Sequence, residues 1–439
     1  MKFSWNHKST LYGRDFSLTF KDLKDALNKK SEPDTLPKKP FIAIKLDRNS
    51  SKTIINLFRA VTNNYCFRLT PEPFPRGKTI MEDDYLLPHS VDNSPPSFIV
   101  QTGGTTGSSK QILRSQNTWM RSFKINRNNW QISDSDSYGI LGDLTHSISL
   151  YGLMEGLYLG SDMNLLSEWL PKSQLANISD REISILYATP IQLQLLIRAY
   201  EIHQIKPIPT LRLIIVGGAK LSATQAKKLP KLFPKAEIAE FYGTAETSFI
   251  TVTSPSTPQG SVGKVYEGVT IRISNDSGEA LPNGEIGDIE VTSPYLFEGY
   301  IFDDKISLNQ NDCFQTGERG YLDDQGNLFL KGRRDRMISI HDINIHPEEV
   351  ENYLQSLPGV EVAYVYPVSD KFNVNHLHAC LFYDSIKPNK NDIARMCRME
   401  LGNYLTPKSF KLISNKPPLL LSGKLDLIAL QNELEQGRW

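Results

Sequence analysis

Residues 98–115, FIVQTGGTTGSSKQILRS, comprise a β-branched run, a loop of Gly, Thr and Ser that ends at Lys110, and a second β-like run. Gly103, Gly104 and Gly107 lack a Cβ, so the backbone can adopt positive φ and turn its N–H groups toward an anion. The loop hydroxyls add donors and Lys110 adds a positive charge. The pattern predicts a phosphate-binding loop between two strands.

The loop differs from a Walker A motif, in which Gly-Lys-Ser/Thr opens a helix. Here Lys110 follows Ser109 and leads into the β-like run Gln111-Ile112-Leu113. A different nucleotide loop is therefore implied. A flexible Gly/Ser surface loop is the alternative interpretation of this stretch taken alone.

Length and composition limit the class of protein. At 439 residues the chain is longer than one core usually supports, so two or more domains are expected. The 49 basic and 49 acidic side chains cancel, which gives no electrostatic reason to expect nucleic acid as a partner. There is no apolar run of about 18 residues, so no transmembrane segment is expected. Four cysteines without Cys-x-x-Cys spacing are typical of reduced thiols in a cytoplasmic protein.

Strand-like and helix-like runs alternate from residue 41 to residue 242. Short helices such as those of residues 51–61 and 190–200 follow apolar runs, and Pro190 and Ser222 stand at helix starts, where these residue types are favoured. The predicted strands are 41–46, 65–69, 182–188, 211–216 and 237–242. This alternation predicts an α/β fold with a doubly wound, mostly parallel sheet, whose ligands bind beyond the carboxyl ends of the strands.

The pattern changes in the last part of the chain. Residues 255–332 have turn signals every eight to twelve residues, which predicts a small antiparallel barrel or sheet. Beyond them, predicted helices at 347–355 and from 391 alternate with strands at 361–367 and 376–383, and a polar tail follows Pro407. We expect a small α+β unit there.

The loop resembles the signature Thr-Ser-Gly-Thr-Thr-Gly-x-Pro-Lys-Gly of AMP-forming adenylating enzymes, the superfamily of acyl- and aryl-CoA synthetases, peptide-synthetase adenylation domains and firefly luciferase. The positions that match are Thr102, Gly104, Thr105, Thr106, Gly107 and Lys110. The positions that depart are Gly103 for Ser, Ser109 for Pro and Gln111 for Gly. The resemblance assigns the loop, Gly103 included, to the β- and γ-phosphates of ATP, and Thr106 to catalysis.

Two downstream segments resemble the nucleotide motifs of the same superfamily. FYGTAET, residues 241–247, is similar to Tyr-Gly-x-Thr-Glu, and VGGAKLS, residues 216–222, is similar to the segment that flanks adenine. The implied nucleotide contacts are Gly217, Gly218, Ala219, Phe241, Tyr242, Gly243 and Thr244. The resemblance makes Glu246 the carboxylate for Mg²⁺ and a catalytic residue.

Two further motifs extend the resemblance toward a hinge. Glu318 stands where the superfamily has the Asp that receives the ribose hydroxyls, so it keeps the charge on a longer side chain. Arg333 is implied to bind the ribose or phosphate side, and Asp335 to be the hinge. Asp342 replaces a Gly that commonly lets a pantetheine arm pass.

The implied hinge at Asp335 divides the chain into two predicted domains. These are a core domain, residues 1–334, and a small mobile domain, residues 335–439.

Near the C-terminus, PLLLSGK, residues 418–424, resembles Pro-x-Thr-x-x-Gly-Lys with Leu420 in place of Thr. The resemblance makes Lys424 the catalytic lysine that bridges the carboxylate and the α-phosphate.

His146 falls where CoA ligases often have a Phe-His pair and peptide-synthetase domains have an Asp for an α-amino group. We therefore list His146 as a catalytic candidate at the acid and expect an acid without an α-amino group. A hydrogen-bonded core histidine is the alternative for His146.

The resemblance covers residues 41–425, with a shorter N-terminal subdomain than is usual, and implies an enzyme that uses ATP and Mg²⁺. A small carboxylic acid would displace pyrophosphate to give an acyl-adenylate, and CoA would then accept the acyl group. This predicts a cytoplasmic AMP-forming acyl- or aryl-CoA ligase of the type found in fatty acid metabolism.

Two alternatives remain for the function. A stand-alone adenylation enzyme would load the phosphopantetheine thiol of an acyl carrier protein after the same first step. A nucleotide-binding pseudoenzyme with a regulatory role is the alternative of another class, and the departures that favour it are Glu318, Asp342 and Leu420. The matching residues that argue for an enzyme are Thr106, Glu246, Arg333 and Lys424.

Overall fold

A computed structural model of the chain describes residues 9–28, 41–45, 51–62, 66–70, 98–102, 110–167, 169–302, 305–340, 343–370, 375–383, 387–414, 416–419 and 425–437. Several predicted site residues lie outside these ranges: Gly103, Gly104, Thr105, Thr106, Gly107 and Lys424. Asp342 and Leu420 also lie outside them.

The strands of the largest sheet in the described chain are β1 (Thr10–Tyr12), β2 (Ser17–Thr19), β7 (Ser137–Ile140), β8 (Asp162–Leu165), β9 (Ile185–Ala188), β10 (Leu213–Val216), β11 (Glu237–Tyr242), β12 (Thr251–Val252) and β13 (Lys264–Val265). Their order is β13-β12-β11-β10-β9-β7-β8-β1-β2. The six strands from β11 to β1 are parallel, and antiparallel strands flank them. Every residue of β9 and β10 is buried, as expected of parallel strands covered on both faces.

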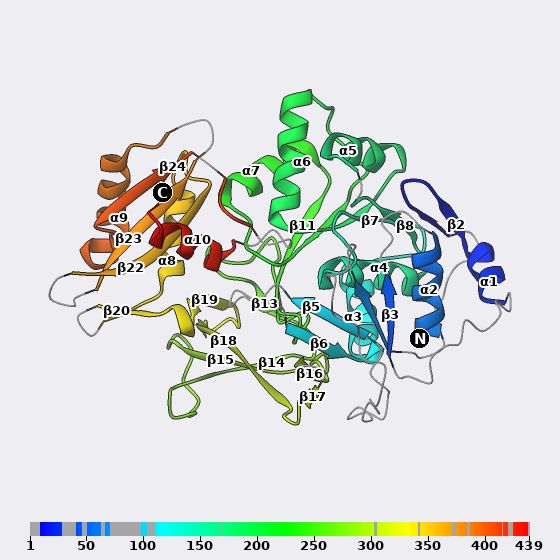
Figure 1. Cartoon of the computed structure of the whole chain (residues 1–439), viewed down its shortest axis with the longest axis horizontal. Helices are drawn as coiled ribbons and strands as arrows, with labels where there is room; N and C mark the ends of the chain where they lie inside the picture. The colour runs from blue at the N-terminus through cyan, green and yellow to red at the C-terminus, as the bar shows by residue number, and fades with distance from the viewer. Residues whose placement is uncertain are drawn as a thin grey trace.

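Helices cover both faces of this sheet (Figure 1). On one face lie α5 (Pro171–Asp180), α6 (Pro190–His203) and α7 (Ala223–Leu232), and on the other lie α3 (Gln116–Asn129) and α4 (Ser147–Leu159). The side chains of β9 alternate accordingly, because Ile185 and Tyr187 pack with α3 and α4 while Leu186 packs with α5 and α6. The predicted doubly wound α/β arrangement is confirmed.

Helix α4 contains glycines that the sequence pattern left without a structural assignment. A Cβ at Gly152 would lie 2.8 Å from the ring of Tyr187, and a Cβ at Gly156 would lie 2.3 Å from the Sδ atom of Met163. These glycines lower the intrinsic helix propensity but let α4 approach the sheet closely. The close approach therefore fixes the distance between α4 and the sheet.

A second sheet presents the predicted phosphate loop. Its strands are β3 (Phe41–Lys45), β4 (Cys66–Thr70), β5 (Phe98–Thr102), β6 (Lys110–Arg114), β16 (Gly299–Phe302) and β17 (Lys305–Leu308), in the order β17-β16-β6-β5-β4-β3. Helix α2 (Ser51–Thr62) packs on β3 and β4, and α1 (Phe20–Asn28) packs on α2. Strands β5 and β6 form an antiparallel hairpin in which Thr102 lies opposite Lys110. The predicted strand, loop and strand order is therefore confirmed at both ends of the loop.

The predicted antiparallel unit is an antiparallel four-stranded sheet, with strands β14 (Thr270–Ser274), β15 (Gly287–Thr292), β18 (Cys313–Leu322) and β19 (Leu328–Arg333) in this order. Strands β16 and β17 come from the same stretch of sequence but extend the second sheet, because β16 pairs with β6. Residues 270–333 therefore connect the four-stranded sheet to the second sheet.

The C-terminal part forms hydrophobic clusters of its own. Its elements are the 3₁₀ helix η1 (Arg334–Arg336), β20 (Ile338–Ile340), β21 (Ile343–Ile345), α8 (Pro347–Ser356), β22 (Val362–Ser369), β23 (Asn375–Phe382), α9 (Lys390–Leu405), β24 (Ser409–Ile413) and α10 (Leu427–Glu435). The predicted polar tail after Pro407 is wrong, because β24 pairs in parallel with β23 and α10 buries Leu430. Ion pairs link this part to the rest, with Lys331 Nζ 3.0 Å from Glu349 Oε1 and Arg198 Nη2 3.3 Å from Glu361 Oε1.

No helix in the described ranges combines the length and apolar character that a membrane span needs.

A buried polar network lies between α3, α4 and the first sheet. The Oε2 atom of Glu155 accepts hydrogen bonds from the hydroxyls of Tyr187 at 2.6 Å and Tyr138 at 3.2 Å, and Oε1 accepts one from the Asn126 amide at 2.7 Å. The Glu155 side chain is fully buried. Burial raises the pKa of this carboxyl to about 7, although the three hydrogen bonds act in the opposite direction.

This shift predicts a pH dependence of stability. Because the pKa of Glu155 rises from 4.5 to about 7 on folding, its stabilising contribution is complete below about pH 4.5 and is lost as the pH rises through about 7. We expect the wild type to lose roughly 2–3 kcal/mol more unfolding free energy than Glu155→Gln between pH 5 and pH 8. Urea unfolding of both proteins across this range tests the difference, and parallel pH curves would contradict it.

Candidate active site

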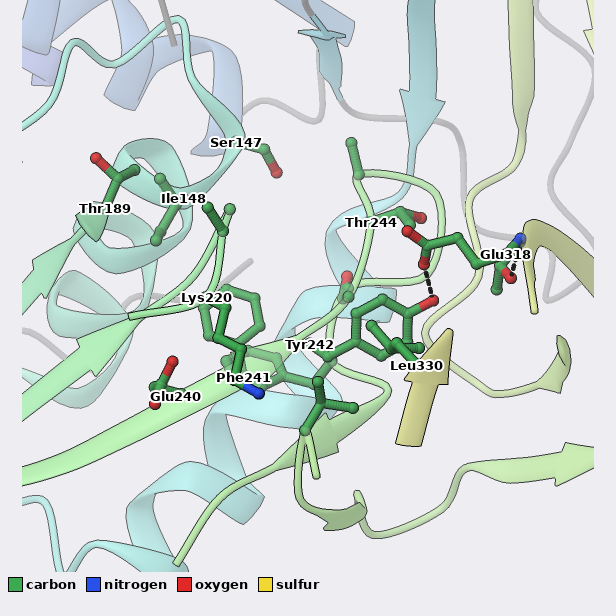
Figure 2. Close-up of a pocket in the computed structure, with 18 of the residues that line it drawn as sticks. Ser147, Ile148, Thr189, Lys220, Glu240, Phe241, Tyr242, Thr244, Glu318 and Leu330 are labelled. Atoms are coloured by element: carbon green, nitrogen blue, oxygen red, sulfur yellow. Dashed lines mark hydrogen bonds between the residues drawn. The ribbon is translucent and has the colours of Figure 1, made fainter. Parts of the chain in front are cut away.

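A cleft of about 990 Å³ lies at the carboxyl ends of β9, β10 and β11 (Figure 2). The N-terminus of α4, strands β18 and β19 and helix α8 complete its walls. Many residues predicted from the sequence line it: Lys110, His146, Gly218, Ala219, Phe241, Tyr242, Gly243, Thr244, Glu246, Glu318 and Arg333. The position is the one at which open α/β sheets bind their ligands.

Tyr242 and Glu318 meet on one side of the cleft although 76 residues separate them. The Tyr242 hydroxyl donates a hydrogen bond to the Glu318 carboxylate, as Figure 2 shows. Thr316 holds this part of β18, since its Oγ1 donates to the Ile289 carbonyl at 3.1 Å and accepts from the Glu318 N–H at 3.1 Å. Burial, followed by the charge of Glu318, raises the pKa of Tyr242 well above its usual value. An aromatic ring and a carboxylate are thus fixed side by side.

Glu246 is held by a residue that the motifs did not indicate. The Tyr300 hydroxyl donates to Glu246 Oε1 at 3.0 Å, and burial, then the Glu246 charge, raises the pKa of Tyr300. Lys110 Nζ lies 5.6 Å from the centroid of the Tyr300 ring, which brings the end of the predicted phosphate loop to the same wall. The Glu246 N–H donates to Thr244 Oγ1 at 3.2 Å, so the loop after β11 also fixes itself.

Carboxylates, imidazoles and thiols do not gather into a metal site of their own. Across the described ranges, no group of three or more His, Cys, Asp or Glu side chains could hold a metal ion. A magnesium ion in a nucleotide site commonly uses one or two carboxylates together with phosphates and water. One carboxylate, Glu246, which accepts the Tyr300 hydrogen bond through Oε1, therefore fits a cation that arrives with substrate phosphates.

Arg114 is a second residue that the motifs missed. Its side chain is fully buried on β6, and its guanidinium donates to the Ala245 carbonyl, the Tyr295 carbonyl and, at 2.8 Å, Ser248 Oγ. Burial lowers its pKa to about 10, and the charge of Glu246 partly opposes this shift. The only sequence signal was a charged residue inside an apolar β-like run. Arg114 ties the strand after the phosphate loop to the segment that carries Glu246.

Gly217 does not line the cleft, in contrast to its neighbour Gly218. A Cβ at Gly217 would lie 2.3 Å from the ring of Phe241, so the ring lies directly over the Gly217 backbone. Gly218 has φ of +90°, in the region that favours glycine. The Phe241 side chain therefore covers the face of Gly217 that the motif assigns to a purine.

Arg333 and Asp335 bind each other at the start of the C-terminal part. The Arg333 Nε and Nη2 atoms donate to the two Asp335 oxygens at 2.9 and 3.0 Å. This pairing is the main cause of the lowered pKa of Asp335. Arg334 binds Asp276 at 2.9 Å and also pairs with Asp288, which fixes the chain just before Asp335. The predicted nucleotide residue and the predicted hinge are in direct contact.

The segment that contains Lys424 is described only at its flanks. Leu419 lines the cleft and forms an antiparallel bridge with Leu425. The two flanks of the segment therefore lie next to each other, and Leu419 brings one of them to the cleft.

Comparison with known proteins identifies the family. Residues 33–301 match the model of the AMP-binding enzyme family. The chain belongs to this family. This AMP-binding enzyme is 32% identical over 351 residues to YhfT of Bacillus subtilis, an uncharacterized acyl–CoA ligase. The alignment covers 79% of this chain and 71% of YhfT. It is 30% identical to the 2-succinylbenzoate–CoA ligase of Bacillus licheniformis, with 75% of this chain and 68% of that protein covered.

Solved structures of other proteins share the fold of this AMP-binding enzyme. The o-succinylbenzoate CoA synthetase of Bacillus subtilis with ATP and magnesium aligns with a TM-score of 0.78 at 22% identity, covering 96% of each chain. The ATP-bound MatB of Rhodopseudomonas palustris aligns with a TM-score of 0.79 at 19% identity, covering 98% of this chain and 96% of MatB. The fold predicted from the resemblance is confirmed.

Replacement of Arg114 should destabilise the protein. Arg114→Met removes the guanidinium that donates to the Ala245 and Tyr295 carbonyls and to Ser248 Oγ, so we expect a loss of roughly 3 kcal/mol or more of unfolding free energy. Arg127→Met, on the exposed face of α3, is the matched control and should change stability by less than about 0.5 kcal/mol. Urea midpoints measure both, and equal midpoints for the two variants would disprove the role of Arg114.

Proposed function

We propose that this AMP-binding enzyme is an ATP-dependent, AMP-forming acid–thiol ligase that activates a carboxylic acid and transfers the acyl group to CoA. The observation that carries the proposal is the assembly of Tyr242, Glu246 and Glu318 around one cleft at the strand ends. The relatives named acyl–CoA ligase and 2-succinylbenzoate–CoA ligase support the same reaction class.

The proposed reaction has two steps. A carboxylate oxygen of the acid attacks the α-phosphorus of ATP, the bond to the bridging oxygen breaks, and pyrophosphate leaves. The CoA thiol, after losing its proton to solvent, then attacks the acyl carbon of the mixed anhydride. AMP leaves with the bonding electron pair, and the thioester remains. Positioning of the reactants and neutralisation of developing charge supply most of the rate acceleration in this type of chemistry.

The proposed nucleotide roles combine the sequence motifs with the arrangement of the described residues in the cleft. We assign the Tyr242 ring to adenine and the Glu318 carboxylate to the ribose hydroxyls, because the two groups lie side by side. The remaining nucleotide assignments are Thr102, Gly103, Gly104, Thr105, Thr106, Gly107 and Lys110 to the phosphates. Glu246 would hold the Mg²⁺ that accompanies ATP, and that cation supplies charge neutralisation at the phosphates.

The remaining assignments concern the acid and the domain movement. His146 precedes α4 and lines the cleft, so we assign it to the acid side. We assign Lys424 to the bridge between carboxylate and α-phosphate. We further propose that residues 1–334 and 335–439 are the two domains and that rotation at Asp335 exchanges Lys424 for the thiol. Separate hydrophobic clusters before residue 331 and after residue 337 support this boundary.

The first step can be tested by carboxylate-dependent ATP–pyrophosphate exchange with a panel of aryl, fatty and amino acids. We expect exchange with at least one acid, and a rate ~10²–10³ lower in Lys424→Ala, because a preorganised cation at the α-phosphate is lost. Lys416→Ala, which changes an exposed lysine that precedes Lys424 in the sequence, is the matched control and should keep the rate. Absence of exchange with every acid would rule out the enzyme and favour a pseudoenzyme.

The thiol acceptor needs a separate assay. AMP and acyl-CoA should form when CoA is added to the exchanging enzyme. Acyl transfer to a holo-carrier protein without transfer to free CoA would instead identify a carrier-loading adenylation enzyme.

Restriction of the hinge should separate the two steps. Asp335→Pro fixes φ at residue 335, so we expect pyrophosphate exchange to stay within about 3-fold of wild type while CoA-dependent AMP release falls ~10-fold or more. Asp335→Ala removes the carboxylate but keeps backbone freedom, so it serves as the control. An equal decrease of both steps in Asp335→Pro would contradict the hinge assignment.

A further inference from the structure

The acid side of the cleft ends on a continuous layer of aromatic rings, which we call the aromatic floor: Trp119, Tyr151, Tyr187, Phe241 and Phe249. The ring centroids of Trp119 and Tyr151 lie 5.1 Å apart, those of Tyr151 and Phe249 5.3 Å apart, and those of Phe241 and Phe249 4.4 Å apart. These distances are typical of rings in direct contact, so the floor has no gap between these pairs.

The tyrosines of the floor are anchored behind it. Tyr187 donates its hydroxyl to the fully buried Glu155, and the Tyr151 hydroxyl bonds Ser122 at 2.7 Å and Asn126 at 3.0 Å. Because these partners are fully buried, the hydroxyls lie on the far side of the floor and the cleft meets ring carbon. Turning either ring aside would leave buried polar groups without partners. The floor is therefore both apolar and rigid.

Phe241 differs from the other four rings. It is half-buried, whereas the other four side chains are at most 5% exposed. Its ring covers the backbone of Gly217 and has no polar atom to anchor. Figure 2 shows Phe241 facing the space below Ser147 and Ile148 at the start of α4. Phe241 thus lies on the same side of the cleft as His146, the residue assigned to the acid, although its motif implied a nucleotide contact.

Resting on the proposed function, we propose that the substrate is a compact apolar acid, an aryl or short branched-chain carboxylic acid, and that Phe241 is the residue that sets this limit. A straight chain of a dozen or more carbons would have to displace Phe241 or the anchored floor. The relatives include proteins named putative long chain fatty acid–CoA ligase and 2-succinylbenzoate–CoA ligase, and the floor favours the compact class.

The test compares acids of different length in pyrophosphate exchange catalysed by the full chain. The acids are benzoate, isovalerate, decanoate and palmitate, and the measured quantity is kcat/KM for each. We expect wild type to favour benzoate or isovalerate over palmitate by ~100-fold or more. Phe241→Ala should raise the ratio of decanoate to benzoate by ~10-fold or more, since each methylene accommodated in an apolar pocket is worth ~10- to 200-fold.

Control variants separate pocket size from general damage. Tyr321→Ala removes an aromatic ring that stacks on Phe329 outside the cleft, and it should keep the wild-type ratio. Phe241→Leu replaces Phe241→Ala if thermal unfolding shows that the alanine variant is not folded, and it should shift the ratio in the same direction by a smaller factor.

Two results would overturn the inference: palmitate used by wild type as efficiently as benzoate, or an unchanged ratio in folded Phe241 variants. Failure of exchange with every acid would instead refute the proposed function. In that case the rise in melting temperature caused by benzoate or by palmitate still measures which acid the cleft accepts, and a larger rise with palmitate would overturn the inference.

Discussion

The parallel pairing of β9, β10 and β11, in which β9 and β10 are buried on both faces, is the constraint on which the site depends. Parallel strands all end at the same edge, so the segments that follow them must gather there. Tyr187, Gly218 and Tyr242 reach one cleft for this reason. The helices that bury the two faces also close the sides of the cleft, because α4 and α6 begin at the same edge. The position of the chemistry is thus a consequence of burying apolar strands.

The second sheet contributes Lys110 and Tyr300 to the cleft. Its hairpin brings Lys110 toward Tyr300, and β16 carries Tyr300 to Glu246. Arg114 joins this sheet to the segment after β11 through backbone carbonyls, which do not depend on the identity of the residues that carry them. A shift of one sheet relative to the other would therefore separate Lys110 from Glu246. Registry between two sheets, and not one local loop, keeps Lys110, Tyr300 and Glu246 together.

Much of the fold and of the site was predictable because local signals carry it. The apolar runs of β9 and β10 and the start of α6 at Pro190 follow from periodicity and propensity, and Tyr242 and Glu246 were found in a compact motif. The residues that were missed act over long separations. Tyr300 binds Glu246 across 54 residues, and Arg114 binds the Tyr295 carbonyl across 181.

The same limit applies to secondary structure. Helix α4 depends on tertiary packing against its glycines, which no helix propensity indicates. Strand β24 and helix α10 likewise depend on β23 and on burial of Leu430, so their sequence alone looked like a polar tail. Segments whose structure comes from distant partners are the ones that a single sequence does not reveal.

The anchoring of the aromatic floor also affects how this cleft can evolve. A change at Tyr187 or Tyr151 disturbs hydrogen bonds with buried groups, so drift at these positions carries a stability penalty. Phe241 has no such hydrogen bond, and Gly217 behind it already provides space. Substitution of Phe241 would therefore enlarge the pocket without breaking a buried hydrogen bond, whereas substitution of Tyr151 or Tyr187 would break at least one.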